Sequence, residues 1–231
     1  MAGIPTWSGK RRARARILLV DDHPLVRERL GEVINREADL AVCAEAEDCV
    51  AAIESIKATD PHLVIIDLTL KNSDGLELIK DIHAEWPSLL MLVVSMHDES
   101  LYAERVLRAG ARGYITKQQA TRSILSAIRR VLAGDIFVSE SMAGKILGRL
   151  TEHKTSNSGE PLSSLADREL QVFELTGHGL NTREIAERLS IGVKTVETYR
   201  HRIREKLQLQ HPRDLLRSAI AWTHQEKKTE L

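Results

Sequence analysis

Five short apolar runs of strand length alternate with stretches in which apolar residues recur at helical spacing. The runs are Ile17–Val20, Leu40–Ala44, Leu63–Ile66, Leu89–Val94 and Gly113–Ile115. Continuous apolar strands separated by helices are typical of a parallel sheet that is covered on both faces and joined by right-handed crossovers. The sequence therefore predicts an α/β domain built on a five-stranded parallel sheet.

The chain has 231 residues, which is long enough for two packed cores. It contains only three Trp, three Tyr and two Phe, so its cores must consist mainly of aliphatic side chains. Two cysteines, Cys43 and Cys49, are too few for a disulfide framework. The longest apolar run after the first basic cluster is ILLV, much shorter than a signal-peptide core or a membrane span. We expect a soluble, cytoplasmic protein of two domains.

Charge is distributed unevenly along the chain. Residues 1–16 contain the basic run KRRARAR and no acid, whereas residues 17–133 contain 13 basic and 19 acidic residues. We predict that residues 1–16 form a flexible arm, which either contacts nucleic acid or is simply a solvated tail.

Carboxylates follow two of the predicted strands. Asp21 and Asp22 end the stretch ILLVDD, and Asp67 ends the run in VIIDLTL. Ligands of open parallel sheets bind beyond the carboxyl ends of the strands. Three acids at one such edge would repel each other by roughly 3 kcal/mol per pair at about 5 Å and an effective dielectric near 20. An oxygen-only cluster of this kind indicates a hard cation such as Mg²⁺, in a site suited to phosphoryl transfer, although solvated acids at strand ends would give the same pattern.

Two further strands end on side chains that suit the same chemistry. Ser95 ends the fourth run and Lys117 follows the fifth. An ammonium group pairs with carboxylate and phosphate oxygens, and a hydroxyl can donate one hydrogen bond to a phosphate. These residues favour a phosphoryl site over solvated acids.

This order of residues resembles the receiver domain of bacterial two-component response regulators, over roughly residues 17–134. The resemblance implies a flavodoxin-like sheet in the order 2-1-3-4-5 and a phosphoacceptor, Asp67, that takes phosphate from a sensor histidine kinase. It implies that Asp22, Asp67 and the backbone carbonyl of Thr69 hold Mg²⁺, with Asp21 assisting through water. It also implies that Ser95 and Lys117 read the phosphate and that Tyr114 is the aromatic switch residue.

The composition changes after residue 133. We predict a receiver domain over 17–133, a linker over 134–162 with a short helix near 143–150, a second domain over 163–225 and a tail over 226–231. Three helical segments open the second domain. The second of them begins after Asn181, which forms a capping-box pattern with Glu184.

The third helical segment has one apolar and one polar face. Apolar residues recur at steps of three and four at Val196, Tyr199, Ile203 and Leu207, and the range 194–206 carries five basic and two acidic residues. A short helix, a tight turn and a basic second helix predict a helix-turn-helix whose later helix enters the DNA major groove. Basic residues such as Arg204 would contact phosphates. A solvated amphipathic helix would explain the charge pattern alone.

The segments GLNTREIAERLSI and VKTVETYRHRIREKL resemble the LuxR-type DNA-binding domain of NarL/FixJ response regulators, over roughly residues 161–225. The resemblance places one group of residues near the DNA backbone, namely Lys194, Thr195, Tyr199 and Arg200. It places a second group toward the bases, namely Glu197, Thr198 and His201. Glu197 either accepts a hydrogen bond from a cytosine amino group or orients Arg200 or Arg204. Ala166 stands where the family commonly has a capping Thr.

One helix-turn-helix buries only about 600–1,000 Å² on DNA, so we expect a homodimer on paired half-sites. In the family, the helix corresponding to 212–222 forms the dimer contact, although core packing would explain its apolar residues equally well.

The sequence thus predicts a phosphorylation-controlled transcription regulator rather than an enzyme, with at most self-phosphorylation and slow self-dephosphorylation. One alternative is a phosphorylation-independent dimeric transcription factor that uses its receiver as an interaction module. Another is an aspartyl-phosphate hydrolase, which is disfavoured because no Asp lies two residues after Asp67. A flavin or dinucleotide binder is disfavoured because the loop DDHP has no glycine.

Overall fold

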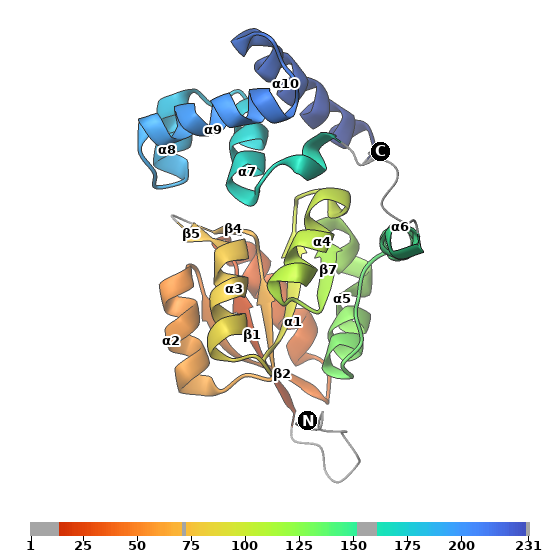
Figure 1. Ribbon diagram of the computed structural model, residues 1–231. Coiled ribbons are helices and arrows are strands. Elements are labelled where there is room, and N and C mark those ends of the chain that lie inside the picture. Colours follow the sequence, from red (N-terminus) through yellow and green to blue (C-terminus); the bar gives the residue numbers. More distant parts are fainter. Residues whose placement is uncertain (1–13, 71–72, 152–160, 230–231) are drawn as a thin grey trace. The chain divides into compact units, whose positions relative to one another are not determined.

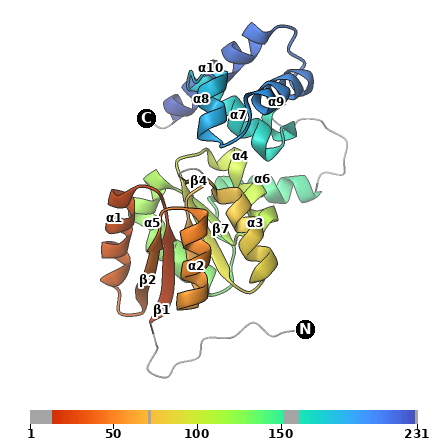
Figure 2. The same cartoon turned by 90° about the vertical axis from the view of Figure 1, so that its left-hand side faces the viewer.

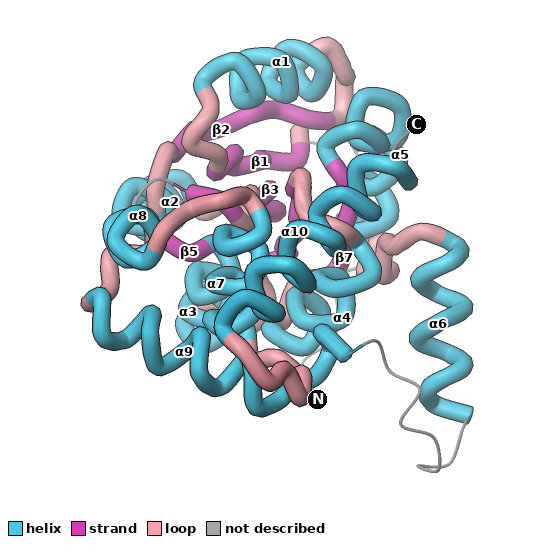
Figure 3. Tube along the Cα trace, turned by 90° about the horizontal axis from the view of Figure 1, so that it is seen from above, coloured by secondary structure: helices cyan, strands magenta, loops and turns pink. Residues whose placement is uncertain are grey.

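The computed structural model describes residues 14–70, 73–151 and 161–229. The chain separates into two compact units, Met1–Thr151 and Glu152–Leu231. All described strands belong to the first unit, and the described part of the second unit is helical (Figure 3). Among the described residues, no helix combines the length and the apolar character needed to cross a membrane.

The first unit is built on a five-stranded parallel sheet (Figure 1). Its strands are β1 (Ala15–Val20), β2 (Leu40–Ala46), β3 (Leu63–Ile66), β6 (Leu90–Ser95) and β7 (Gly113–Thr116). The strand order is β2-β1-β3-β6-β7, which is 2-1-3-4-5 when the sheet strands are numbered along the chain. A separate two-stranded hairpin pairs β4 (Thr69–Leu70) with β5 (Ser73–Asp74). The predicted fold class of this domain is confirmed.

Five helices cover the two faces of the sheet (Figures 1 and 2). They are α1 (Pro24–Asn35), α2 (Cys49–Thr59), α3 (Gly75–Glu85), α4 (Glu99–Ala109) and α5 (Lys117–Leu132). Side chains accept hydrogen bonds from free amide groups at the starts of four of them, which explains where these helices begin; the capping residues are Asp48, Asp74, Asp98 and Thr116.

The sheet is buried on both sides, which explains why its strands read as uninterrupted apolar runs. On the face covered by α1 and α5, Ile17, Leu19 and Ile65 pack in one core with Ile124 and Ile128 of α5. Each such side chain contributes about 1.5–3 kcal/mol through burial. This core fixes the carboxyl ends of the strands, where the candidate site lies.

Three features of the structure lie near the predicted domain boundaries. β1 begins at Ala15, whose amide donates to the carbonyl of Asp39, so the predicted arm over 1–16 ends earlier; residues 1–13 lie outside the described part of the chain. The predicted short helix near 143–150 is longer, forming α6 (Glu140–Thr151). The backbone of Phe137 pairs with the edge of β7, and Met142 is buried, so residues through 151 pack with the first unit rather than forming an open linker.

The second unit contains a 3₁₀ turn, η1 (Pro161–Ser164), followed by four helices. These are α7 (Asp167–Gly177), α8 (Thr182–Arg188), α9 (Val193–Lys206) and α10 (Pro212–Thr229). Its core contains Leu170, Phe173, Ile185, Val196 and Ile203. α8, a short turn and α9 form the predicted helix-turn-helix, and the all-α class of this domain is confirmed.

The start of α7 is only half capped. Ala166 stands at the N-cap and has no side-chain acceptor, while Glu169 accepts a 2.8 Å hydrogen bond from the Ala166 amide. Glu169 is buried and pairs with Lys206 of α9 at 2.7 Å. Burial would raise the pKa of Glu169, but the bonds from Lys206 and from the Ala166 amide lower it overall. α7 therefore starts without one of the two bonds of a full capping box.

Replacing Ala166 with Thr should complete this box and stabilise the second unit by about 1 kcal/mol, because the hydroxyl can accept from a free amide of the first turn. Calorimetry of the full-length protein should show a higher melting temperature for the transition of this unit. Ala221→Thr, at an exposed position inside α10, is the control. It should bring no gain, because the backbone amides inside a helix are already bonded and Thr has a lower helix propensity than Ala. Equal melting temperatures for Ala166→Thr and wild type would refute the prediction.

Candidate functional site

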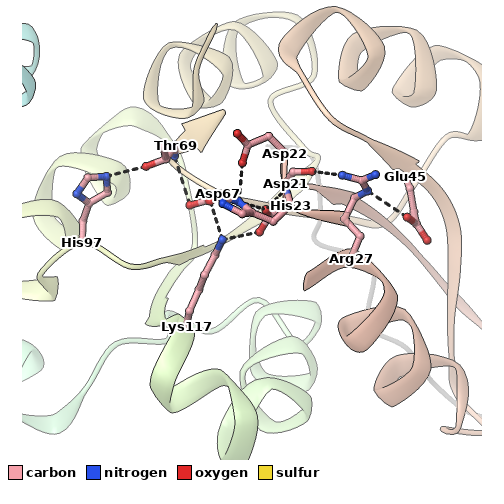
Figure 4. A network of polar contacts seen from close by, with 9 residues as sticks. All are labelled: Asp21, Asp22, His23, Arg27, Glu45, Asp67, Thr69, His97 and Lys117. Atoms are coloured by element: carbon pink, nitrogen blue, oxygen red, sulfur yellow. Dashed lines mark hydrogen bonds and ion pairs between the residues drawn. The ribbon is translucent and has the colours of Figure 1, made fainter. Parts of the chain in front are cut away.

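Asp21, Asp67 and Lys117, which follow three strands of the first unit, point toward one another in one pocket (Figure 4). Asp21 follows β1, Asp67 follows β3, Ser95 ends β6 and Lys117 follows β7. Asp21, Asp67 and Ser95 are buried, with 4%, 3% and 0% of their surfaces exposed. Such burial of two carboxylates requires a compensating cation.

Lys117 supplies that positive charge. Its Nζ lies 2.7 Å from Asp21 Oδ2 and 2.8 Å from Asp67 Oδ2. Burial raises the pKa of Asp67, and the neighbouring Lys117 ammonium acts in the opposite direction. Desolvation alone would lower the pKa of Lys117, but the two carboxylates raise it overall. The ammonium group thus holds the two strand ends together electrostatically.

A group of possible metal ligands lies beside this ion pair. One ligand atom from each of Asp21, Asp22, His23 and Asp67 lies within 4.8 Å of the others. His23 Nδ1 is 2.7 Å from Asp22 Oδ1 and 3.2 Å from Asp21 Oδ1. The three carboxylates fit a hard divalent cation, because Mg²⁺ prefers oxygen ligands. The Thr69 amide donates to Asp67 Oδ1 at 3.3 Å, which puts Thr69 next to this group.

Arg27 and Glu45 hold the backbone of Asp21 in place, and the sequence analysis predicted a role for neither residue. Arg27 Nη1 donates to the Asp21 carbonyl at 2.5 Å, and its Nε donates to Glu45 Oε2 of β2 at 3.2 Å. The two bonds fix the peptide that carries Asp21. The only feature of the sequence that could have indicated this support is the position of Arg27, one turn into the helix that follows Asp21 and Asp22.

The loop after β6 closes another side of the pocket. His97 Nε2 lies 3.0 Å from the Thr69 hydroxyl, and the His97 ring lies against Tyr102 with centroids 4.6 Å apart. The hydroxyl of Tyr114, a fully buried residue, donates to the His97 carbonyl at 2.7 Å. The His97 amide donates to Ser95 Oγ at 3.4 Å. The structure thus joins the predicted switch residues Ser95 and Tyr114 through the backbone of His97.

Gly75 permits close packing behind Asp67. A Cβ at Gly75 would collide with the Asp67 carbonyl and would lie 2.7 Å from Leu68 Cα. The Gly75 amide also donates to the Leu68 carbonyl at 3.1 Å. The start of α3 can therefore contact the Asp67 loop only with glycine at this position.

The second unit presents a polar helix face. Val196 and Ile203 of α9 are buried, whereas most residues predicted to contact DNA are exposed: Lys194, Thr195, Glu197, Thr198 and His201. Tyr199 is half-buried. Arg204 is also partly buried, and its Nη2 lies 3.4 Å from His201 Nδ1. This arrangement agrees with a recognition helix whose apolar side packs on α7 and α8.

Arg200 lies differently from the other predicted DNA contacts. Its guanidinium donates to Thr182 Oγ1 at 2.9 Å and, at 3.3 Å each, to Thr176 Oγ1 and the Leu180 carbonyl. Desolvation lowers its pKa. The structure therefore uses this side chain to hold α9 against the α7–α8 turn.

Two family models match the two units. Residues 17–129 match the response regulator receiver domain, and residues 163–219 match the bacterial regulatory proteins of the luxR family. The fold, the acidic pocket and these matches define a two-component response regulator with a LuxR-type DNA-binding domain. The chain belongs to the NarL/FixJ-type response regulators.

Named relatives cover nearly the whole chain. It is 31% identical over 209 residues to the oxygen regulatory protein NreC of Staphylococcus carnosus, covering 89% of this chain and 96% of the relative. NreC of Staphylococcus aureus strain MRSA252 is 32% identical over 209 residues, which again cover 89% of this chain and 96% of the relative. RcsB of Salmonella enterica serovar Typhimurium, bound to promoter rprA with the phosphomimetic BeF₃⁻, is 25% identical with a TM-score of 0.64, covering 89% of this chain and 98% of that one. A LuxR-family two-component response regulator from Aurantimonas sp. SI85-9A1 is 37% identical with a TM-score of 0.56, covering 61% of this chain and 100% of that one.

Gly75→Ala should displace the Asp67 loop, because backbone atoms rather than flexible side chains occupy the space of the new methyl group. We expect a loss of about 1–3 kcal/mol in the unfolding free energy of the first unit, as is usual for overpacking. Urea unfolding followed by circular dichroism measures it. Gly144→Ala in α6, where no atom lies within 4 Å of the added carbon, should leave the unit equally or slightly more stable. Equal losses for both variants would show that Gly75 has no special packing role.

Proposed function

We propose that a sensor histidine kinase phosphorylates Asp67 and that this modification controls dimerisation and sequence-specific binding to promoter DNA in the cytoplasm. The observation that carries the proposal is the buried Asp67 carboxylate held at 2.8 Å by Lys117 beside Asp21 and Asp22. A buried, oriented carboxylate next to a fixed cation suits nucleophilic attack on a phosphoryl group.

In the proposed reaction, a carboxylate oxygen of Asp67 attacks the phosphorus atom of the phosphohistidine, forming an acyl phosphate as the bond to the histidine nitrogen breaks. Asp22, Asp67 and the Thr69 carbonyl would hold Mg²⁺, with Asp21 assisting through water. When bound, Mg²⁺ supplies positive charge that offsets the charge of the phosphoryl oxygens. Lys117 would pair with one phosphoryl oxygen, and the Ser95 hydroxyl would donate to another.

The contacts around His97 connect the pocket to the buried switch residue Tyr114. The His97 backbone bonds to both Ser95 and Tyr114, and its side chain bonds to Thr69. A movement of Ser95 toward a phosphoryl group would therefore alter the loop that carries the acceptor of the Tyr114 hydroxyl. A ligand that favours one packing over another shifts the population between them.

For the second unit we propose that α9 enters the major groove, with Lys194, Thr195, Tyr199 and Arg204 near the backbone and Glu197, Thr198 and His201 toward the bases. Arg200 would act there mainly by positioning α9. The similarity to RcsB structures bound to DNA supports this proposal. We propose a homodimer as the active form, with α10 as the contact, because paired half-sites multiply a weak single-domain affinity. The only reactions proposed for the chain are its own phosphorylation and slow dephosphorylation.

Asp67→Asn should abolish the response to phosphorylation but leave basal DNA binding, because it removes the attacking oxygen and leaves the second unit intact. DNA fragments selected by the wild-type protein would be footprinted with and without acetyl phosphate and Mg²⁺. Wild type should gain about a hundredfold in affinity with the donor, the lower end of the range for an avidity effect. Asp81→Asn, an exposed position on α3, is the matched control and should gain as wild type does.

Two results would contradict this proposal. If wild type gains no affinity while its Asp67 carries phosphate, the protein is the phosphorylation-independent dimer of the alternative interpretation. If Asp67→Asn gains affinity as wild type does, another group receives the phosphate.

Breaking the contact between His97 and Thr69 should shorten the life of the phosphorylated form, because this pair closes one side of the pocket to water. His97→Ala and Thr69→Ala should each shorten its half-life roughly two- to tenfold, which corresponds to one neutral hydrogen bond of ~0.5–1.5 kcal/mol. Phosphate-affinity gels after removal of the donor would follow the decay.

The double variant separates a shared contact from two unrelated effects. His97→Ala with Thr69→Ala should decay no faster than either single variant, because both remove the same hydrogen bond. Met96→Ala, at a 60% exposed position in the same loop, should decay as wild type does. Additive effects in the double variant would argue against a joint role.

A further inference from the structure

Glu197 poses an electrostatic problem on the face of α9 that we propose binds DNA. Glu197 is exposed and shares a helical stripe with Lys194 and His201, which lie three residues before it and four after it, while the exposed Thr198 lies beside this stripe. Val196 and Ile203 form the buried side of α9, which is separate from the exposed face that carries Glu197. Duplex DNA carries one negative charge per about 1.7 Å of its axis, so a carboxylate on this face meets strong repulsion unless a donor receives it.

The two arginines that Glu197 could orient contact other groups. Arg200 donates to Thr182, Thr176 and the Leu180 carbonyl, and Arg204 contacts His201 Nδ1. Within the described part of the chain, no hydrogen bond or ion pair involves the side chain of Glu197. The structure therefore disfavours the interpretation that Glu197 orients Arg200 or Arg204 and leaves a carboxylate with free acceptor oxygens.

The other base-facing side chains differ in this respect. The Thr198 hydroxyl donates to the Lys194 carbonyl at 2.9 Å, and His201 Nε2 lies 3.4 Å from Glu205 Oε1 while its Nδ1 faces Arg204. Both side chains have a partner within the helix. Glu197 is the base-facing residue whose hydrogen-bonding capacity is wholly available to DNA.

Only two base edges in the major groove offer a donor to such a carboxylate. Cytosine presents its N4 amino group, whereas adenine presents its N6 amino group beside the N7 acceptor. A carboxylate has no proton for N7 and its second oxygen would be repelled by that lone pair, so cytosine is the better partner. Guanine and thymine place acceptors where the carboxylate would lie.

We propose that Glu197 is a specificity-determining residue that accepts a hydrogen bond from the N4 amino group of one cytosine in each half-site. This inference rests on the proposed DNA-binding function and adds the base that the face reads. Each half-site should therefore contain a C·G pair in fixed orientation opposite Glu197. Replacing that pair should weaken wild-type binding on the order of tenfold.

The test is selection from a random duplex library by the full-length protein with acetyl phosphate and Mg²⁺, followed by sequencing. Wild type should enrich a motif with one invariant cytosine in each half-site. Glu197→Gln should change that cytosine to adenine and leave the rest of the motif, because an amide both accepts from N6 and donates to N7. Glu197→Ala should accept any base at that position.

Two control variants separate base reading from general charge effects. Glu187→Gln removes an exposed carboxylate from α8 and should select the wild-type motif. Lys194→Ala should weaken all sequences alike without changing the motif, as expected for a phosphate contact.

The outcomes of this selection distinguish the inference from the proposed function. If Glu197→Gln and Glu197→Ala both select the wild-type motif, Glu197 does not read a base and the inference is overturned, while the DNA-binding function stands. If phosphorylated wild type enriches no motif, sequence-specific DNA binding itself is refuted.

Discussion

The placement of Lys117 between Asp21 and Asp67 is the interaction on which the first unit depends. Two carboxylates that are at most 4% exposed would each incur a desolvation cost of several kcal/mol, and their mutual repulsion would add to it. The ammonium at 2.7 and 2.8 Å offsets both effects. Because Lys117 also begins α5, the pocket is tied to the helix whose apolar side forms much of the core on that face. Core packing and pocket charge are therefore parts of one arrangement.

The sequence predicted the parallel sheet because buried strands leave an unbroken apolar pattern, whereas the strand order followed only from the resemblance to receiver domains. It predicted the acidic pocket because strand ends in a parallel sheet converge. It did not predict the support from Arg27 and Glu45 or the contact of His97 with Thr69. These pairs join residues that are 18 and 28 positions apart, and their side chains carry no periodic pattern. The pairing of Phe137 with the edge of β7 was not predicted either, because it is made through the backbone, which leaves no pattern in side-chain type.

His97 links the acidic pocket to the buried residue Tyr114. Its amide, carbonyl and ring contact three different elements: Ser95 at the end of β6, Tyr114 in β7 and Thr69 in the β4 hairpin. A single loop residue with three such partners cannot shift without changing all three contacts. In the proposed mechanism, this coupling lets a group the size of a phosphate affect the packing of Tyr114, which is fully buried.

In the second unit, part of the positive charge that marks α9 as a DNA-binding helix is used inside the domain. Arg200 bonds to the α7–α8 turn, and Lys206 pairs with the buried Glu169, so both orient the helix before DNA is present. Fewer cations then remain for phosphates than the sequence suggests, and the affinity of one domain falls accordingly because phosphate contacts dominate it. In the proposed dimer, a second copy would compensate for the weak affinity of one such helix. That dependence is what would allow a receiver that controls pairing to control transcription.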